Sequence, residues 1–260
     1  MILSDEVVVV TGIGAGLGAK LSARIAAEGG KVVMVSRKTD IMEQVQKEIE
    51  AAGGEALCVP ANVVKEEDCA RVAEAAVERF GRITGLVNSA YAHPGFSDLL
   101  DTPDKLLRRA MDVSFFGALS MTRAVVPHMK AAGHGSIVNV GTMTTRKPMR
   151  GEGGYAAAKA AMGNASQMLA LELGEHNIRV NQAVMGWLDG PGVQFYLQMT
   201  ADEKGITTQD VYDDIASRNP LGRIPTDDAC AKAVLFLLSD YASEVSGAVL
   251  DVNGGEYMPA

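Results

Sequence analysis

Tyr155 and Lys159 are the residues of this sequence whose types and spacing best suit acid–base chemistry. They stand four positions apart in a helix-like run, and residues four apart share one helix face. A phenol with an ordinary pKa of about 10 is a poor acid or base at neutral pH. A nearby ammonium favours the phenolate and lowers that pKa, so we expect Lys159 to tune Tyr155 for proton exchange with a carbonyl or alcohol oxygen. The alternative is an ordinary surface pair on a helix.

A glycine-rich segment near the N-terminus is the second candidate site. It follows an apolar strand-like run and opens a helix-like run, the context in which glycines let the backbone approach a pyrophosphate. A flexible loop is the alternative, but this context favours dinucleotide binding. The predicted contacts are Thr11, Gly12, Gly14, Gly16, Leu17 and Gly18.

The end of the second predicted strand indicates which dinucleotide binds. A carboxylate at this point would bind the ribose 2′-hydroxyl of NAD, but the sequence has Ser36 and Arg37 and no carboxylate before Asp40. Both side chains can bind a 2′-phosphate, so we predict NADP(H) as cofactor. Asn62 and Val63, after the third strand, are candidates for the adenine contact. For Asn62 the alternative is an ordinary turn asparagine.

Composition limits the class of protein. The chain has 260 residues, a net charge of −8, 22% charged and 47% hydrophobic residues. This mix is typical of a globular protein, and the acidic balance argues against nucleic acid as a partner. Three cysteines without a CxxC pair predict neither a zinc site nor a disulfide framework, and suggest a reducing compartment. An acidic start and short apolar runs predict no signal peptide and no membrane span. We therefore expect a cytoplasmic protein without a metal.

The elements that must position these residues alternate between strands and helices along the whole chain. Short β-branched runs between amphipathic helices predict a parallel sheet covered on both faces. No linker or repeat interrupts the pattern, so we predict one domain, 1–260, with a substrate lid at about 188–219. Strands are expected at 7–11, 31–35, 56–59, 85–87, 136–140, 178–184 and 248–252, and helices at 17–28, 39–52, 66–80, 103–131, 155–175 and 226–238.

The ordered motifs resemble the short-chain dehydrogenase/reductase family over nearly the whole chain. The resemblance implies an α/β Rossmann fold, a doubly wound sheet of seven parallel strands, with a nicotinamide cofactor and a homotetramer, or at least a dimer. The matching segments are Thr11–Gly18, Asn88–Ala90, Gly135–Asn139, Tyr155 with Lys159, Ile178–Asn181, Asn219–Arg223 and Asp251–Gly255.

The resemblance also implies a role for each matching residue. Tyr155 corresponds to the catalytic acid–base group, and Lys159 to the lysine that also holds the nicotinamide ribose. Thr142 stands where the family has a serine that binds the substrate oxygen. Ser114 stands where it often has an asparagine that supports a relay water.

Further cofactor contacts implied by the resemblance are Asn88, Ala90, Gly186 and Leu188. A threonine that often binds the carboxamide is replaced by Gly190, which leaves that contact to backbone groups.

The loops at the strand ends carry aromatic and methionine side chains, which suit a sizeable apolar ligand. Packing of the lid onto the core is the alternative. Arg146, Lys147 and Arg150 either attract an acidic substrate group or are simply solvated. The predicted substrate pocket consists of Tyr91, His93, Met143, Met149, Trp187 and Phe195.

These observations predict an NADP-dependent oxidoreductase that acts on a ketone or a secondary alcohol, with a fairly bulky apolar substrate. One alternative is a 3-oxoacyl-thioester reductase, with the acyl group on acyl carrier protein or coenzyme A. Another is a cofactor-binding protein with little turnover. The sequence leaves the substrate, the direction and the hydride face open.

Overall fold

The central sheet is built from runs of valine, isoleucine and other apolar residues that pair in parallel. The computed structural model describes residues 1–259; Ala260, the last residue of the predicted domain, lies outside them. The strand order is β3-β2-β1-β4-β5-β6-β7, so the predicted seven-stranded parallel sheet is confirmed. The strands are β1 (Val7–Thr11), β2 (Lys31–Ser36), β3 (Ala56–Pro60), β4 (Gly85–Asn88), β5 (Gly135–Thr142), β6 (Ile178–Met185) and β7 (Val249–Val252).

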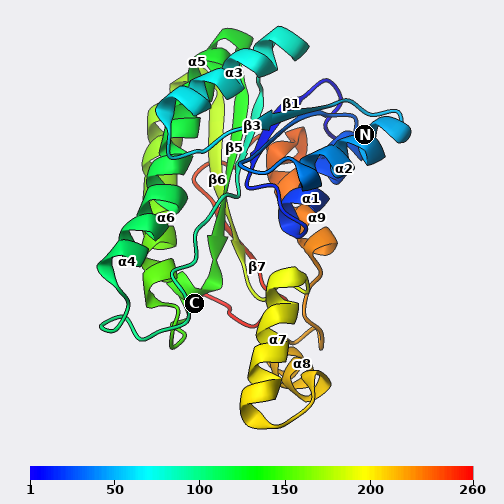
Figure 1. Cartoon of the computed structure of the whole chain (residues 1–260). Coiled ribbons are helices and arrows are strands. Elements are labelled where there is room, and N and C mark those ends of the chain that lie inside the picture. The colour runs from blue at the N-terminus through cyan, green and yellow to red at the C-terminus, as the bar shows by residue number, and fades with distance from the viewer. Residues whose placement is uncertain (260) are drawn as a thin grey trace.

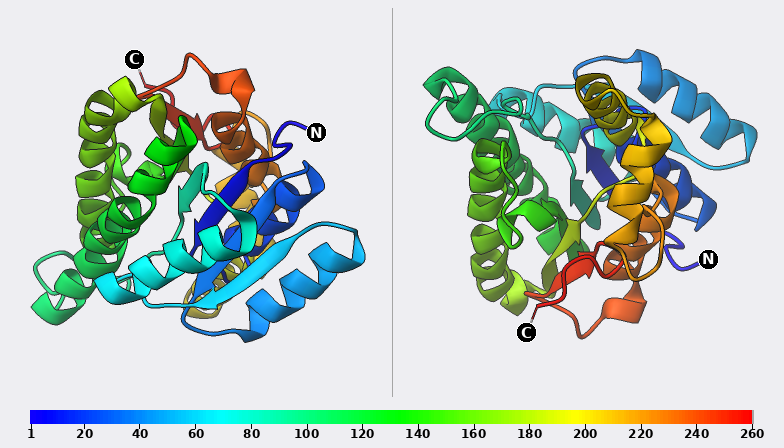
Figure 2. Two further views of the ribbon diagram at one scale, coloured as in Figure 1. Left: turned by 90° about the horizontal axis from the view of Figure 1, so that it is seen from above. Right: turned by 90° about the horizontal axis from the view of Figure 1, so that it is seen from below.

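Helices cover both faces of this sheet (Figures 1 and 2). One layer consists of α1 (Leu17–Ala27), α2 (Asp40–Ala51) and α9 (Asp227–Leu238). The other consists of α3 (Glu66–Phe80), α5 (Ala118–Ala132) and α6 (Gly153–Leu173).

Successive side chains of one strand point to opposite faces, which explains why the strands are apolar throughout. Val8 and Val10 pack under the layer that contains α1, whereas Val7 and Val9 pack under the layer that contains α3. All four side chains are at most 1% exposed.

The helix expected at 103–131 is interrupted. It divides into α4 (Asp104–Met111), a π-helical turn (Asp112–Gly117) and α5. Such turns insert one residue into a helix, frequently at functional sites. At the end of this turn, a Cβ on Gly117 would lie 2.7 Å from Cγ2 of Val63, so the helix approaches the loop after β3 closely. The helical pattern of residues 103–131 in the sequence gave no sign of this interruption.

The predicted lid contains two helices, α7 (Pro191–Lys204) and α8 (Thr208–Ser217), which project from the carboxyl end of the sheet (Figure 1). They pack against each other through a small separate core that includes Leu197, Val211 and Ile215. Within residues 1–259, no helix combines the length and apolarity needed to cross a bilayer.

Candidate active site

A cavity of about 580 Å³ opens at the carboxyl ends of β1, β4, β5 and β6. Parallel sheets place their ligands at this edge, because the loops that follow the strands meet there. Most of the predicted site residues line it together. They are Gly12, Gly14, Gly16, Leu17, Gly18, Tyr91, His93, Thr142, Met143, Met149, Tyr155, Lys159, Gly186, Trp187, Leu188 and Phe195.

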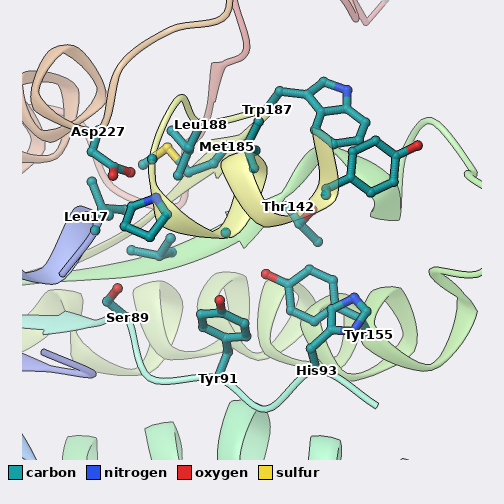
Figure 3. Close-up of a pocket in the computed structure, with 18 of the residues that line it drawn as sticks. Leu17, Ser89, Tyr91, His93, Thr142, Tyr155, Met185, Trp187, Leu188 and Asp227 are labelled. Carbon is teal, nitrogen blue, oxygen red and sulfur yellow. The ribbon is translucent and has the colours of Figure 1, made fainter. Parts of the chain in front are cut away.

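Tyr155 and Thr142 face the same part of the cavity from different elements. Tyr155 lies in the first turn of α6, and Thr142 is the last residue of β5. In Figure 3 Thr142 lies across the cavity from the ring of Tyr155, whose hydroxyl end points into the cavity. Thr142 is 8% exposed, and its hydroxyl lies 3.1 Å from that of Thr144. Two hydroxyl groups from different elements therefore line the same cavity.

Lys159 lies one turn further along α6 and is buried. Its Nζ donates a hydrogen bond of 2.7 Å to the carbonyl oxygen of Val140 and lies 6.0 Å from the ring centroid of Tyr91. Desolvation lowers the pKa of Lys159 from 10.5 to about 8, because burial penalises the ammonium. The lysine is thus held at the wall of the cavity rather than in solvent.

The pKa of Tyr155 departs from the expected direction. Burial, followed by the effects of Tyr91 and Glu152, holds it well above its ordinary value. Burial disfavours the phenolate, and both neighbours add negative charge when ionised. In this structure Tyr155 is therefore a protonated phenol at neutral pH, the form that donates a proton to a carbonyl oxygen.

A histidine–glutamate pair borders Tyr155. Nε2 of His93 lies 3.2 Å from Oε2 of Glu152, and the backbone N–H of Gly95 donates to Nδ1 of His93 at 3.1 Å. Since Nδ1 accepts a hydrogen bond, the proton of the neutral imidazole lies on Nε2 and points to Glu152. The imidazole centroid lies 5.1 Å from that of Tyr155. Glu152 was not predicted, and only its position three residues before Tyr155 could have suggested it.

The glycine turn fits the diphosphate of a dinucleotide. Gly12 has a φ of +79°, and a Cβ there would lie 2.6 Å from the backbone of Ala90. Around Gly14 the space is open, since a Cβ would meet no atom within 4 Å. No side chain caps the start of α1, so its backbone N–H groups are available to an anion.

Two residues predicted to contact the cofactor also link neighbouring strands of the sheet, and their cofactor roles stay predictions. The Thr11 hydroxyl donates to the carbonyl of Val87 at 3.3 Å and accepts from the N–H of Ser89 and of Ala90. Asn88 is buried and donates to Oδ1 of Asn139 at 2.9 Å. Neither residue lines the cavity; Ala90 instead contacts Gly12 through its backbone.

The predicted 2′-phosphate and adenine contacts lie beyond the cavity, at the ends of β2 and β3. Arg37 is exposed and makes no hydrogen bond or ion pair within residues 1–259, and Ser36 is half-buried beside it. Asn62 accepts the N–H of Val64 at 3.3 Å and so forms the turn before α3. Val63 is buried in the core against Gly117. The cofactor roles of these residues stay predictions.

Ser114 is buried in the π-helical turn, where its hydroxyl accepts the N–H of Ala92 at 3.4 Å. It therefore fixes the loop that carries Tyr91 and His93. The relay role implied by the family resemblance stays a prediction.

The cavity wall opposite the loop of Tyr91 and His93 comes from β6 and the segment that follows it. Figure 3 shows Met185, Trp187 and Leu188 on this wall. Trp187 packs on Tyr196 with ring centroids 4.9 Å apart, and Tyr196 also meets Phe96 at 5.8 Å. Cavity residues that were absent from the predicted site are Ala15, Ser89, Val140, Gly141, Thr144, Glu152, Met185, Pro191, Gly192, Val193 and Asp227. Phe96, Gly190 and Tyr196 belong to loops that were expected at the site, and they line the cavity as well.

Known proteins resemble this chain along almost its entire length. The family model described as enoyl-(acyl carrier protein) reductase matches residues 12–256. A 7alpha-hydroxysteroid dehydrogenase from Escherichia coli is 30% identical over 253 residues, 97% of this chain and 94% of the relative. A cis-4-hydroxycyclohexanecarboxylate dehydrogenase from Sinomonas cyclohexanicum is 33% identical over 97% and 96% of the two chains. A short-chain type dehydrogenase/reductase from Mycobacterium ulcerans, a solved structure, aligns with a TM-score of 0.89 at 28% identity, over 98% and 91%.

Proposed function

The chain belongs to the short-chain dehydrogenase/reductase family, whose members are oxidoreductases with a nicotinamide cofactor, and from this premise we propose its reaction. We propose that it interconverts a ketone and a secondary alcohol on a bulky, largely apolar alicyclic substrate, with NADP(H) as cofactor. The observation that carries this proposal is that Tyr155, Lys159 and Thr142 line the same cavity.

The bound cofactor supplies or accepts a hydride. The protein's own groups manage the proton and the substrate oxygen. Thr142 and Tyr155 donate hydrogen bonds to the carbonyl oxygen, and Tyr155 transfers the proton. The protonated Tyr155 is the form that acts in ketone reduction, and its phenolate is the form that acts in alcohol oxidation. Lys159 supports the nicotinamide end of the site.

The shape and chemistry of the cavity support an alicyclic substrate. Tyr91, Met149, Trp187 and Phe195 line the same cavity as Tyr155 and give it apolar and aromatic surface. Two relatives are dehydrogenases of ring-bearing alcohols by name, a hydroxysteroid and a hydroxycyclohexanecarboxylate. We further propose that α7 and α8 form the lid of this pocket within a single domain.

Reduction of a 3-oxoacyl thioester is the alternative, and the family model's description refers to an acyl carrier protein. The basic residues near the site do not favour docking of an acidic carrier. Arg146 pairs with Asp251 and Lys147 with Glu256, at 2.5 and 2.9 Å. The exposed Arg150 pairs with Asp98.

A substrate panel tests the proposal. NADPH oxidation is followed with alicyclic ketones, linear ketones and an acetoacetyl thioester. A higher kcat/KM for the alicyclic ketones than for the linear ketones and the thioester supports the proposal. A preference for the thioester establishes the alternative. Tight NADPH binding without turnover of any ketone would leave a cofactor-binding protein and overturn the proposed reaction.

A further inference from the structure

Asp227 places a buried carboxylate in the cofactor end of the cavity. It is the first residue of α9, it is 7% exposed, and it lines the cavity. Its carboxylate has no hydrogen-bond donor and no ion-pair partner within residues 1–259. The neighbouring Asp228 differs, because it forms an ion pair with Arg24 at 2.6 Å and is well exposed. The carboxylate lines the open cavity, so a group that enters the cavity, either solvent or a ligand, is its available partner.

The carboxylate lies at the junction of three helix N-termini. Oδ2 of Asp227 is 3.1 Å from where a Cβ on Gly16 would be, and Gly16 precedes the first residue of α1. A Cβ on Gly190, which precedes α7, would overlap the same oxygen. The absence of side chains at both glycines makes room for the carboxylate. In Figure 3 it points toward the part of the cavity where Leu17 begins α1.

Backbone contacts fix the carboxylate at this place. The N–H of Asp189 donates to the carbonyl of Pro225 at 2.8 Å, and Asp189 forms a parallel β-bridge with Thr226. The hydroxyl of Thr226 accepts the N–H of Ala229 and caps α9. Asp227 is thereby held between the segment after β6 and the glycine turn.

An anion at the N-terminus of α1 occupies the position that suits a diphosphate, because the helix dipole and the free N–H groups favour negative charge there. We propose that the carboxylate of Asp227 competes with the cofactor's diphosphate for this position, so that cofactor binding transfers a proton from solvent to Asp227. The site then binds a dinucleotide more weakly as the pH rises. This proposal rests on the dinucleotide binding that the proposed function requires.

The charges around Asp227 are consistent with protonation. Burial, the largest effect, and Asp189 raise its pKa, whereas Lys20 on α1 lowers it. Arg24 is already paired with Asp228. Tyr91, on the facing loop, has its own pKa raised by burial and by Asp227. A diphosphate beside the carboxylate would raise the pKa of Asp227 further, which requires proton uptake on binding.

Calorimetric titration with ADP-ribose tests proton uptake directly. ADP-ribose has the diphosphate but neither the nicotinamide nor a 2′-phosphate, whose own titration near pH 6 would add protons of its own. Titrations in two buffers of different ionisation enthalpy give the number of protons bound with each ligand. We expect fractional uptake for the parent protein and none for Asp227→Asn. The Asp228→Asn variant removes the same charge one residue away and is expected to behave like the parent.

Affinity provides the second readout. Asp227→Asn is expected to bind ADP-ribose and NADPH more tightly than the parent at about pH 8, by about tenfold for each unit of pKa shift that binding imposes. The difference should shrink as the pH falls toward and below the pKa of Asp227 in the free protein, where the parent becomes protonated as well. Circular dichroism checks that the variant is folded.

Three results would overturn the proposal. If the parent binds ADP-ribose without proton uptake, the proposed competition between Asp227 and the diphosphate is refuted. The proposed function is not affected by that result. Weaker binding of NADPH by Asp227→Asn, with ADP-ribose unchanged, would show that the carboxylate contacts the nicotinamide half instead. No binding of any dinucleotide by the parent would contradict both this proposal and the proposed function.

Discussion

The imidazole of His93 donates its Nε2 proton to Oε2 of Glu152 across 3.2 Å, and the two residues are 59 positions apart in the sequence. The contact joins the loop after β4 to the start of α6, and so places a carboxylate beside the phenol of Tyr155. Glu152 contributes to the raised pKa of Tyr155. The acid–base behaviour of Tyr155 therefore depends on this neighbour as well as on burial and on Tyr91.

Replacement of Glu152 by glutamine is expected to lower the pKa of Tyr155, because one negative charge beside the phenol is lost. The glutamine oxygen can still accept the His93 proton. Alcohol oxidation requires the phenolate, so the midpoint of the pH profile of kcat should move to lower pH. Asp98→Asn, which removes a carboxylate that pairs with the exposed Arg150, serves as control. A midpoint that moves upward would contradict this account.

Tyr155→Phe removes the transferable proton but retains the ring. We expect kcat to fall by at least about 10²–10⁴-fold, the usual contribution of a general acid–base group. NADPH affinity, measured by fluorescence, should stay nearly unchanged. Tyr241→Phe removes a hydroxyl from an exposed ring and should have no effect. If Tyr155→Phe turns over substrate at nearly the parent rate, Tyr155 is not the acid–base group. His93 and Tyr91 would then be the next candidates.

The exposed Arg37 at the end of β2 predicts the cofactor preference. We expect NADPH to bind more tightly than NADH by roughly 1–3 kcal/mol, the scale of a charge-assisted hydrogen bond. Arg37→Asp should reverse the preference, because a carboxylate repels the 2′-phosphate and accepts the 2′-hydroxyl. Arg108→Asp, an equal charge change on α4, is the control. Equal dissociation constants for both cofactors in the parent would refute this assignment.

Lys159 predicts a pH-dependent difference in stability. Folding lowers its pKa from 10.5 to about 8, so between these values the unfolded chain binds more protons at this residue. Stability then rises with pH in that window. The free energy of unfolding of the parent, relative to Lys159→Met, should increase between about pH 7 and pH 10 in urea titrations. The exposed Lys204→Met should show no such trend, and a constant difference for Lys159→Met would exclude the lowered pKa.

The assembly expected from the family resemblance can be tested on one surface. Phe116, Met168 and Leu171, in the π-helical turn and α6, are exposed by 52, 49 and 81%. Oligomers commonly pair the same patch across a two-fold axis. Light scattering should give a tetramer, or at least a dimer, and Leu171→Glu should lower the mass. Leu221→Glu, which changes an exposed leucine after α8, is the control. A parent protein that is a monomer at micromolar concentration would contradict the expected assembly.

The sequence by itself determined the features that depend on local order along the chain. The apolar runs specified the seven strands, since a strand buried on both faces must be apolar throughout. The glycine spacing from Gly12 to Gly18 specified the turn, and the spacing of Tyr155 and Lys159 specified a shared helix face. Each of these rules acts over a few residues, so it can be applied before the fold is known.

The tertiary structure alone decided the electrostatics of the site. Glu152 and Asp227 belong to segments whose sequences resemble ordinary helix starts, and only the sheet topology brings them to the cavity beside Tyr155 and Gly16. The direction of the Tyr155 pKa shift was wrongly predicted for the same reason. A helix face shows that Lys159 is near, but burial and the neighbours Tyr91 and Glu152 come from packing between distant segments, and their effects raise the pKa.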